Sequence, residues 1–142
     1  RTTWGYKDYA IKVAFNPYAN QREFFLLKLL QNYPRLAKYF PKPYAISKCG
    51  KVMIVERIWG SDFRKKYQAG QWNETEKRRV EGRIRFLFQK HGILDVMVDD
   101  INAGNLMRRE LSGRRVIIDL GHFWIAGESP TYKQMLEEVP VY

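Results

Sequence analysis

The sequence is poor in the residues that form disulfides and zinc sites. Its 142 residues include one cysteine, Cys49, and two histidines, His91 and His122. One thiol cannot form a disulfide within the chain, and these three residues fall short of the ligands that a structural zinc site needs. The composition predicts no zinc and a reducing, intracellular compartment, and it favours an ordinary surface thiol over a nucleophile for Cys49.

Long apolar runs, repeats and low-complexity segments are also missing. No stretch reaches the roughly 18 uninterrupted apolar residues of a transmembrane helix. Residues 1–9 are polar and aromatic, unlike the apolar core of a secretory signal peptide. These absences predict a cytoplasmic protein with no membrane span.

The chain does contain enough apolar residues for one well-packed domain. It is 45% hydrophobic and 15% aromatic, which argues against disorder. The net charge of +10 favours acidic partners, namely nucleotides, nucleic acid, an anionic membrane surface or an acidic protein. About half of the basic residues lie between residues 64 and 115, so this part of the chain carries the strongest positive field.

Residue patterns in the first part of the chain predict strands around one helix. Residues 9–15 alternate between apolar and polar and predict a strand. Asn16 followed by Pro17 predicts the start of a helix that runs to about Leu30. Prolines then predict a loop, and the apolar segments on either side of the Cys49 turn, residues 44–46 and 52–55, predict a strand pair.

The second part of the chain has more helical patterns. The helix predicted at residues 73–91 carries Lys and Arg over much of its surface. Such a face is usually only solvated, but a docking site for an acidic protein partner is the second interpretation. The remaining elements predicted here are a helix at 62–67, strands at 106–107 and 116–118, and a last helix at 132–138.

Three polar residues in this second part suggest phosphoryl transfer. That reaction needs a carboxylate that orients the attacking hydroxyl and oxygen ligands that hold Mg²⁺ against the phosphates. Asp100 suits the first role, while Asn105 and Asp119 suit the second. A short loop joins Asp100 to Asn105, and the strand ending at Ile118 delivers Asp119, so we expect all three side chains to face one point.

These residues resemble motifs of the protein-kinase superfamily. Asp100 and Asn105 match the spacing of its catalytic loop, and Asp119-Leu120-Gly121 resembles its metal-binding Asp-Phe-Gly. Tyr9-Ala10-Ile11-Lys12 is similar to its Val-Ala-Ile-Lys strand, and Glu23 stands where the helical partner of that lysine belongs. The resemblance implies ATP and Mg²⁺ as cofactors, with Lys12 on the α- and β-phosphates and Asp100 as the catalytic carboxylate.

Residues 54–63 are similar to the hinge that joins the two lobes of a kinase. The resemblance places Val55 as the gatekeeper beside the adenine. The main-chain carbonyl of Glu56 and the amide of Ile58 would then hold the adenine, and Asp62 would contact the ribose.

The resemblance extends over about residues 6–125 and implies an α+β, two-lobed protein-kinase-like fold. We expect a single domain with an N-lobe of about residues 1–55, a hinge at 56–60 and a reduced C-lobe at 61–142. The N-lobe would hold a small antiparallel sheet with one helix, and the truncated C-lobe would be mostly helical. Asp100-Ile101-Asn102-Ala103-Gly104-Asn105 most resembles the minimal Ser/Thr kinases that bacteria inject into host cells, the OspG and NleH group. That likeness implies an effector with a protein substrate.

The sequence departs from the kinase pattern at several positions. Gly5 is the only glycine among the eleven residues before Lys12, so no glycine-rich loop covers the phosphates unless the chain has been trimmed. Val98-Asp99 replaces the usual His-Arg before the catalytic aspartate, which removes the anchor for a phosphorylated activation loop. Asn102 stands where many Ser/Thr kinases have a phosphate-facing lysine.

Each candidate residue also has an ordinary structural interpretation. Lys12 fits a solvent-facing strand lysine, and Glu23 lies three residues after Asn20, the spacing of a capping box. Asp99 and Asp100 fit the cap of a turn.

Three other functions compete with a protein kinase. One is a pseudokinase that recruits an acidic protein, favoured by the missing glycine-rich loop. Another is a small-molecule phosphotransferase, for which the chain lacks the larger second lobe. Nucleic-acid binding is disfavoured because it rests on charge alone.

Overall fold

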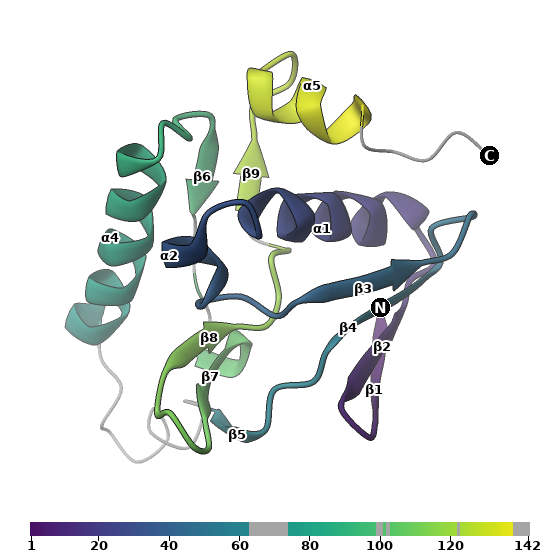
Figure 1. The fold of residues 1–142 in the computed structure, drawn as a ribbon, viewed down its shortest axis with the longest axis horizontal. Helices are drawn as coiled ribbons and strands as arrows, with labels where there is room; N and C mark the ends of the chain where they lie inside the picture. Colours follow the sequence, from purple (N-terminus) through teal and green to yellow (C-terminus); the bar gives the residue numbers. More distant parts are fainter. Residues whose placement is uncertain (63–73, 99–100, 102, 122, 138–142) are drawn as a thin grey trace.

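The computed structural model describes residues 1–62, 74–98, 101, 103–121 and 123–137 (Figure 1). Its first part is a four-stranded antiparallel sheet with the order β1-β2-β4-β3. The hairpin predicted around Cys49 is present, and the thiol is exposed in the turn. The strands are β1 (Thr2–Tyr6), β2 (Tyr9–Val13), β3 (Pro43–Ile46) and β4 (Val52–Glu56).

Helix α1 (Pro17–Leu30) packs against this sheet and confirms the predicted bounds. Asn16 caps it, because its side-chain oxygen accepts a hydrogen bond of 3.0 Å from the amide of Tyr18. The phenylalanines and leucines of α1 are almost fully buried between the sheet and the rest of the molecule. The proline-rich segment after α1 is not simply a loop, since Pro34 opens the short helix α2 (Pro34–Ala37).

The second part combines helices with two small antiparallel sheets. Helix α4 (Glu74–Lys90) agrees with the predicted basic helix, and helix α5 (Pro130–Glu137) begins two residues earlier than predicted. One sheet has the order β5-β7-β8 and the other pairs β6 with β9, and a 3₁₀ turn, η1 (Ala103–Asn105), precedes β7. The strands are β5 (Gly60–Asp62), β6 (Val96–Val98), β7 (Leu106–Arg109), β8 (Arg115–Ile117) and β9 (Phe123–Ile125).

Two expectations for this part need correction. Asp62 does not begin a helix but ends β5, where it pairs with Met107 of β7; the rest of the helix predicted at 62–67 lies outside the described residues. The second part was expected to be mostly helical, but it also contains the strands β5, β6 and β9. The chain is therefore a mixed α and β fold with several small antiparallel sheets.

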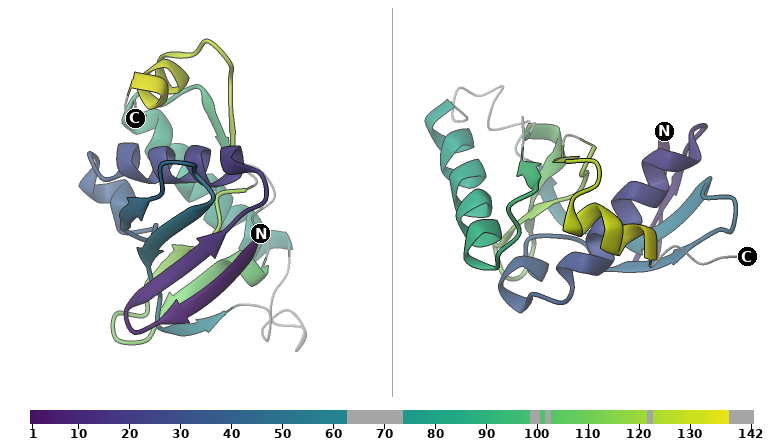
Figure 2. Two further views of the ribbon diagram at one scale, coloured as in Figure 1. Left: turned by 90° about the vertical axis from the view of Figure 1, so that its right-hand side faces the viewer. Right: turned by 90° about the horizontal axis from the view of Figure 1, so that it is seen from above.

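A shared apolar core connects the two parts. Phe40, which follows α2, stacks parallel to Phe88 of α4, and both meet the ring of Phe123 edge-on. Seen from above in Figure 2, α4 lies at one end of the molecule and the four-stranded sheet at the other, with this core between them. None of the helices in the described part of the chain is long and apolar enough to cross a membrane.

Candidate active site

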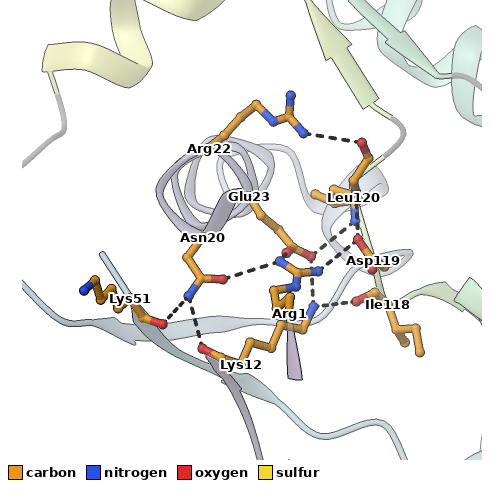
Figure 3. Close-up of polar contacts among 10 residues, drawn as sticks. Arg1, Lys12, Asn20, Arg22, Glu23, Lys51, Ile118, Asp119 and Leu120 are labelled. Atoms are coloured by element: carbon orange, nitrogen blue, oxygen red, sulfur yellow. Dashed lines mark hydrogen bonds and ion pairs between the residues drawn. The ribbon is translucent and has the colours of Figure 1, made fainter. Parts of the chain in front are cut away.

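Lys12 is a buried residue of the central strand β2, with 5% of its surface exposed. Its Nζ donates to Glu23 Oε1 at 2.9 Å and to the main-chain carbonyl of Ile118 at 2.8 Å (Figure 3). The ion pair expected from the sequence is therefore present, and the alternative of a solvent-facing lysine is wrong. A buried ammonium is stable only when it is paired in this way, so its position is tightly fixed.

Glu23 lies in the middle of α1 and is 3% exposed. The same oxygen that binds Lys12 accepts a hydrogen bond of 3.2 Å from the amide of Leu120, and the other oxygen pairs with the guanidinium of Arg1. Because α1 already begins at Pro17, Glu23 is not part of a capping box. Asn20 is fully buried and instead donates to the carbonyls of Lys12 and Lys51, at 3.1 and 2.9 Å.

Asp119 follows β8 and faces the same cluster, with its side chain 36% exposed. Its Oδ1 lies 3.0 Å from Arg1 Nη2 and accepts a hydrogen bond of 2.7 Å from the amide of Gly121. Burial raises the pKa of this carboxyl, but the charges of Arg1 and Lys12 and the Gly121 amide outweigh it, so the pKa lies below its usual range. Asp119 is therefore a partly exposed carboxylate that Arg1 and the Gly121 amide hold in place.

A pocket of about 300 Å³ brings together residues that are far apart in the sequence. Six of the residues predicted for the site line it, and Glu23 lies behind Lys12. Asp100 and the side chain of Asp62 lie outside what the structure describes. Strand β1 forms a further wall of the pocket through Thr3, Trp4 and Gly5. The predicted residues in its lining are Lys12, Val55, Glu56, Ile58, Asn105 and Asp119.

The hinge-like segment forms one side of this pocket. The Glu56 carboxylate makes a bidentate ion pair with Arg109 of β7, at 2.8 and 3.2 Å. Burial raises the pKa of Glu56, but the bonds from Arg109 and from the Lys42 amide outweigh it and hold the pKa below its usual range. This pair fixes the end of β4 to β7, so the main chain of residues 56–58 has a defined position beside the pocket.

Asn105 and Asp119 both line this pocket, and their side chains carry oxygen donors of the kind that Mg²⁺ binds. The amide of Ile118 donates to the carbonyl of Asn105 at 2.8 Å, which holds the two segments together. The described residues include no cluster of three His, Cys, Asp or Glu that could hold a metal alone. Mg²⁺ commonly uses one or two protein ligands together with phosphates and water, so the donors present fit this ion.

Sequence reasoning missed two residues of this cluster. Arg1 bridges Glu23 and Asp119, and the strong field of these two carboxylates raises its pKa although burial opposes this. Arg22 donates to the carbonyl of Gly121 at 3.3 Å and so holds the segment after Asp119 to α1. No motif marks either arginine, because their contacts arise only from the packing of β1 and α1 against residues 118–121.

The similarity of this chain to known proteins was found in structure and not in sequence. No protein-family model matches the sequence, and no curated protein matches it. Among solved structures, the kinase PK-1 of the Cydia pomonella granulovirus is 16% identical with a TM-score of 0.55. That match covers 87% of this chain and 46% of PK-1.

WbdD, described as a bifunctional kinase-methyltransferase, is 19% identical with a TM-score of 0.52, covering 90% of this chain and 31% of WbdD. WbdD bound to the kinase inhibitor LY294002 matches with a TM-score of 0.53. The chain therefore has a protein-kinase-like fold, and it spans less than half the length of either protein.

Proposed function

We propose that this chain is an ATP- and Mg²⁺-dependent phosphotransferase whose acceptor is a Ser or Thr hydroxyl of a protein. The observation that carries the proposal is the meeting of Lys12, Asn105 and Asp119 in one pocket next to the hinge-like segment. The protein-kinase-like fold supports it independently of those residues. Kinship with the OspG and NleH effectors, and a role inside a host cell, stay predictions from the sequence.

In this proposal Lys12 binds the α- and β-phosphates of ATP. Its ammonium is already oriented by Glu23, so little conformational entropy is lost when the nucleotide arrives. No described residue accepts a hydrogen bond from the Ile58 amide, which leaves this donor for the adenine edge, beside the carbonyl of Glu56. The low pKa of Asp119 keeps it ionised at neutral pH, as a metal ligand must be.

The transfer itself needs one more group, the Asp100 carboxylate. In the proposed step the hydroxyl oxygen of the acceptor forms a bond to the γ-phosphorus and loses its proton to Asp100. The bond from the γ-phosphorus to the β,γ-bridging oxygen breaks, and ADP leaves with that electron pair. Mg²⁺ held by Asn105 and Asp119 would neutralise phosphate charge.

Calorimetry of ATP binding tests the proposal. We expect ATP to bind with a heat that depends on Mg²⁺, because Asp119 and Asn105 hold the ion only together with phosphate oxygens. The Lys12→Met variant should bind ATP at least about tenfold more weakly, since the phosphates lose a buried cation. ATP binding that is the same with Mg²⁺ and with EDTA, or that Lys12→Met leaves unchanged, would contradict a metal-nucleotide site.

One observation favours a second function, a binding module without catalysis. The guanidinium of Arg1 lies between Glu23 and Asp119, where it neutralises the carboxylate proposed to hold the metal. If this contact persists in solution, the chain keeps a kinase-like fold while its own arginine competes with the ion. The two functions then differ in whether nucleotide and metal displace Arg1.

The Arg1→Gln variant separates the two functions. If Arg1 competes with the metal, its removal should tighten binding of Mg²⁺-ATP by about three- to tenfold in calorimetry, as loss of a partly exposed ion pair suggests. Arg22→Gln is the matched control, because Arg22 contacts the neighbouring carbonyl of Gly121 but no carboxylate in the described structure. Weaker binding in Arg1→Gln would instead make Arg1 a ligand of the phosphates.

A further inference from the structure

A second pocket, of about 260 Å³, has a lining that shares no residue with the candidate active site. Three segments build it: the end of α2, one face of α4, and the β7–β8 hairpin. In this lining, five of the described residues are basic and none is acidic. The basic residues are Lys38, Arg79, Arg83, Arg114 and Arg115.

The arginines of α4 reach this pocket because of their spacing. Arg79 and Arg83 are four residues apart, so they lie on the same side of the helix, next to the buried Val80 and Ile84. Two like charges at this spacing repel each other and destabilise a helix slightly. Adding Arg114 from the hairpin increases the repulsion, which an anion bound in the pocket would relieve.

Four of the five basic residues of this pocket have no ion-pair partner among the described residues. Lys38, Arg79, Arg83 and Arg114 have no carboxylate within ion-pair distance among the described residues, whereas Arg115 has an interaction partner of its own. Some basic residues elsewhere are engaged: Lys12 pairs with Glu23, Arg109 pairs with Glu56, and Arg85 donates to the carbonyl of Val98. This pocket thus gathers four cations without a carboxylate partner among the described residues in one lining.

The walls between the cations are apolar and firmly held. Val80, Ile84, Leu106 and Ile117 form them, and all four are at least 90% buried. The amide of Ile117 donates to the carbonyl of Tyr39 at 2.8 Å, which ties β8 to the segment after α2. The pocket is therefore preformed, with a cationic rim around an apolar floor.

We infer that this pocket binds an acidic peptide segment of a partner protein, with one apolar side chain of the peptide seated between flanking carboxylates. Carboxylates would meet the rim, and the apolar side chain would meet the floor. A single-stranded nucleic acid fits less well, because it would offer phosphates to the rim but also uses aromatic side chains on which its bases stack. Tyr39 is the only aromatic residue in the described lining, and the Lys38 ammonium lies over its ring at 5.5 Å.

Fluorescence anisotropy with a defined peptide tests this inference. The probe is a fluorescein-labelled peptide with one leucine flanked on both sides by glutamates, titrated at low salt to limit screening. We expect the Arg79→Gln/Arg83→Gln double variant to weaken binding by about tenfold, as loss of two exposed charge pairs suggests. The matched control Arg78→Gln/Lys90→Gln removes the same charge from exposed positions of α4 outside the described lining, and should weaken binding less than about twofold.

Two further probes separate this site from a diffuse positive field. A peptide with serine in place of leucine should bind more weakly, because it leaves the apolar floor unfilled. Equal binding of the two peptides, or equal losses in the two double variants, would overturn the inference. So would a single-stranded oligonucleotide that binds more tightly than the peptide and loses that affinity in Arg79→Gln/Arg83→Gln. The test is independent of phosphotransfer, so its outcome and that of ATP calorimetry can differ.

Discussion

Replacing Asp119 by Asn should lower phosphotransfer by about a thousandfold while the protein stays folded. Asn keeps the shape of the side chain and can still accept the 2.7 Å hydrogen bond from the Gly121 amide. It loses the negative charge that Arg1 and Lys12 stabilise as a carboxylate. The proposed metal site would then keep only neutral protein donors, which bind Mg²⁺ poorly.

The measurement is transfer of labelled phosphate from ATP to a generic Ser/Thr acceptor protein, or to the chain itself. Asp100→Ala should cause a loss of about a hundred- to ten-thousandfold, since it removes the proposed general base. Asp8→Asn is the matched control: it makes the same exchange at a carboxylate that contacts Trp59 and lies outside the site pocket. Equal labelling by wild type, Asp119→Asn and Asp100→Ala would refute the phosphotransferase.

The largest effect on stability should come from Glu23→Ala. This change leaves Lys12 buried without its carboxylate, and it removes the acceptor of the Leu120 amide. Breaking one side of a buried ion pair typically costs about 3–5 kcal/mol, because the remaining charge stays desolvated. We therefore expect the free energy of unfolding, measured by urea titration, to fall by about that amount.

Two companion variants make this measurement specific. Glu23→Gln keeps an acceptor for both Lys12 and Leu120, so its loss should be smaller than that of Glu23→Ala. Glu137→Ala, at an exposed position of α5, should change the free energy of unfolding by less than about 0.5 kcal/mol. If Glu23→Ala and Glu137→Ala had the same free energy of unfolding, the buried ion pair would not stabilise the fold.

Local signals explain what the sequence predicted well. The start of α1 follows from Asn16 and Pro17, whose capping and fixed backbone angle act within one turn of the helix. The β3–β4 hairpin likewise follows from two apolar segments around a turn. The motif resemblance predicts that Lys12 pairs with Glu23. The sequence alone leaves a capping box as the alternative, and the start of α1 at Pro17 rules that alternative out by placing Glu23 in the middle of the helix.

Contacts between distant segments explain what the sequence did not predict. Strands β6 and β9 have three residues each and pair across 25 or more positions, so their pattern is too short to recognise. The pairing of Asp62 with Met107 joins positions still farther apart in the sequence, and the local pattern at Asp62 predicts a helix instead. The bridge from Arg1 to Glu23 and Asp119 requires three segments to come together. Of the basic pocket, the sequence pattern indicates only the basic face of one helix.

The segment from Ile117 to Leu120 also bears on how the protein unfolds. Its amides donate to three different places: Ile117 to the carbonyl of Tyr39, Ile118 to that of Asn105, and Leu120 to the carboxylate of Glu23. Hydrogen exchange at these amides requires that each bond open to water. Because the acceptors lie in separate elements, such opening must loosen several of them together. The amides of Ile117, Ile118 and Leu120 should therefore exchange slowly and as one cooperative unit, linking the stability of α1 to that of the small β7–β8 hairpin.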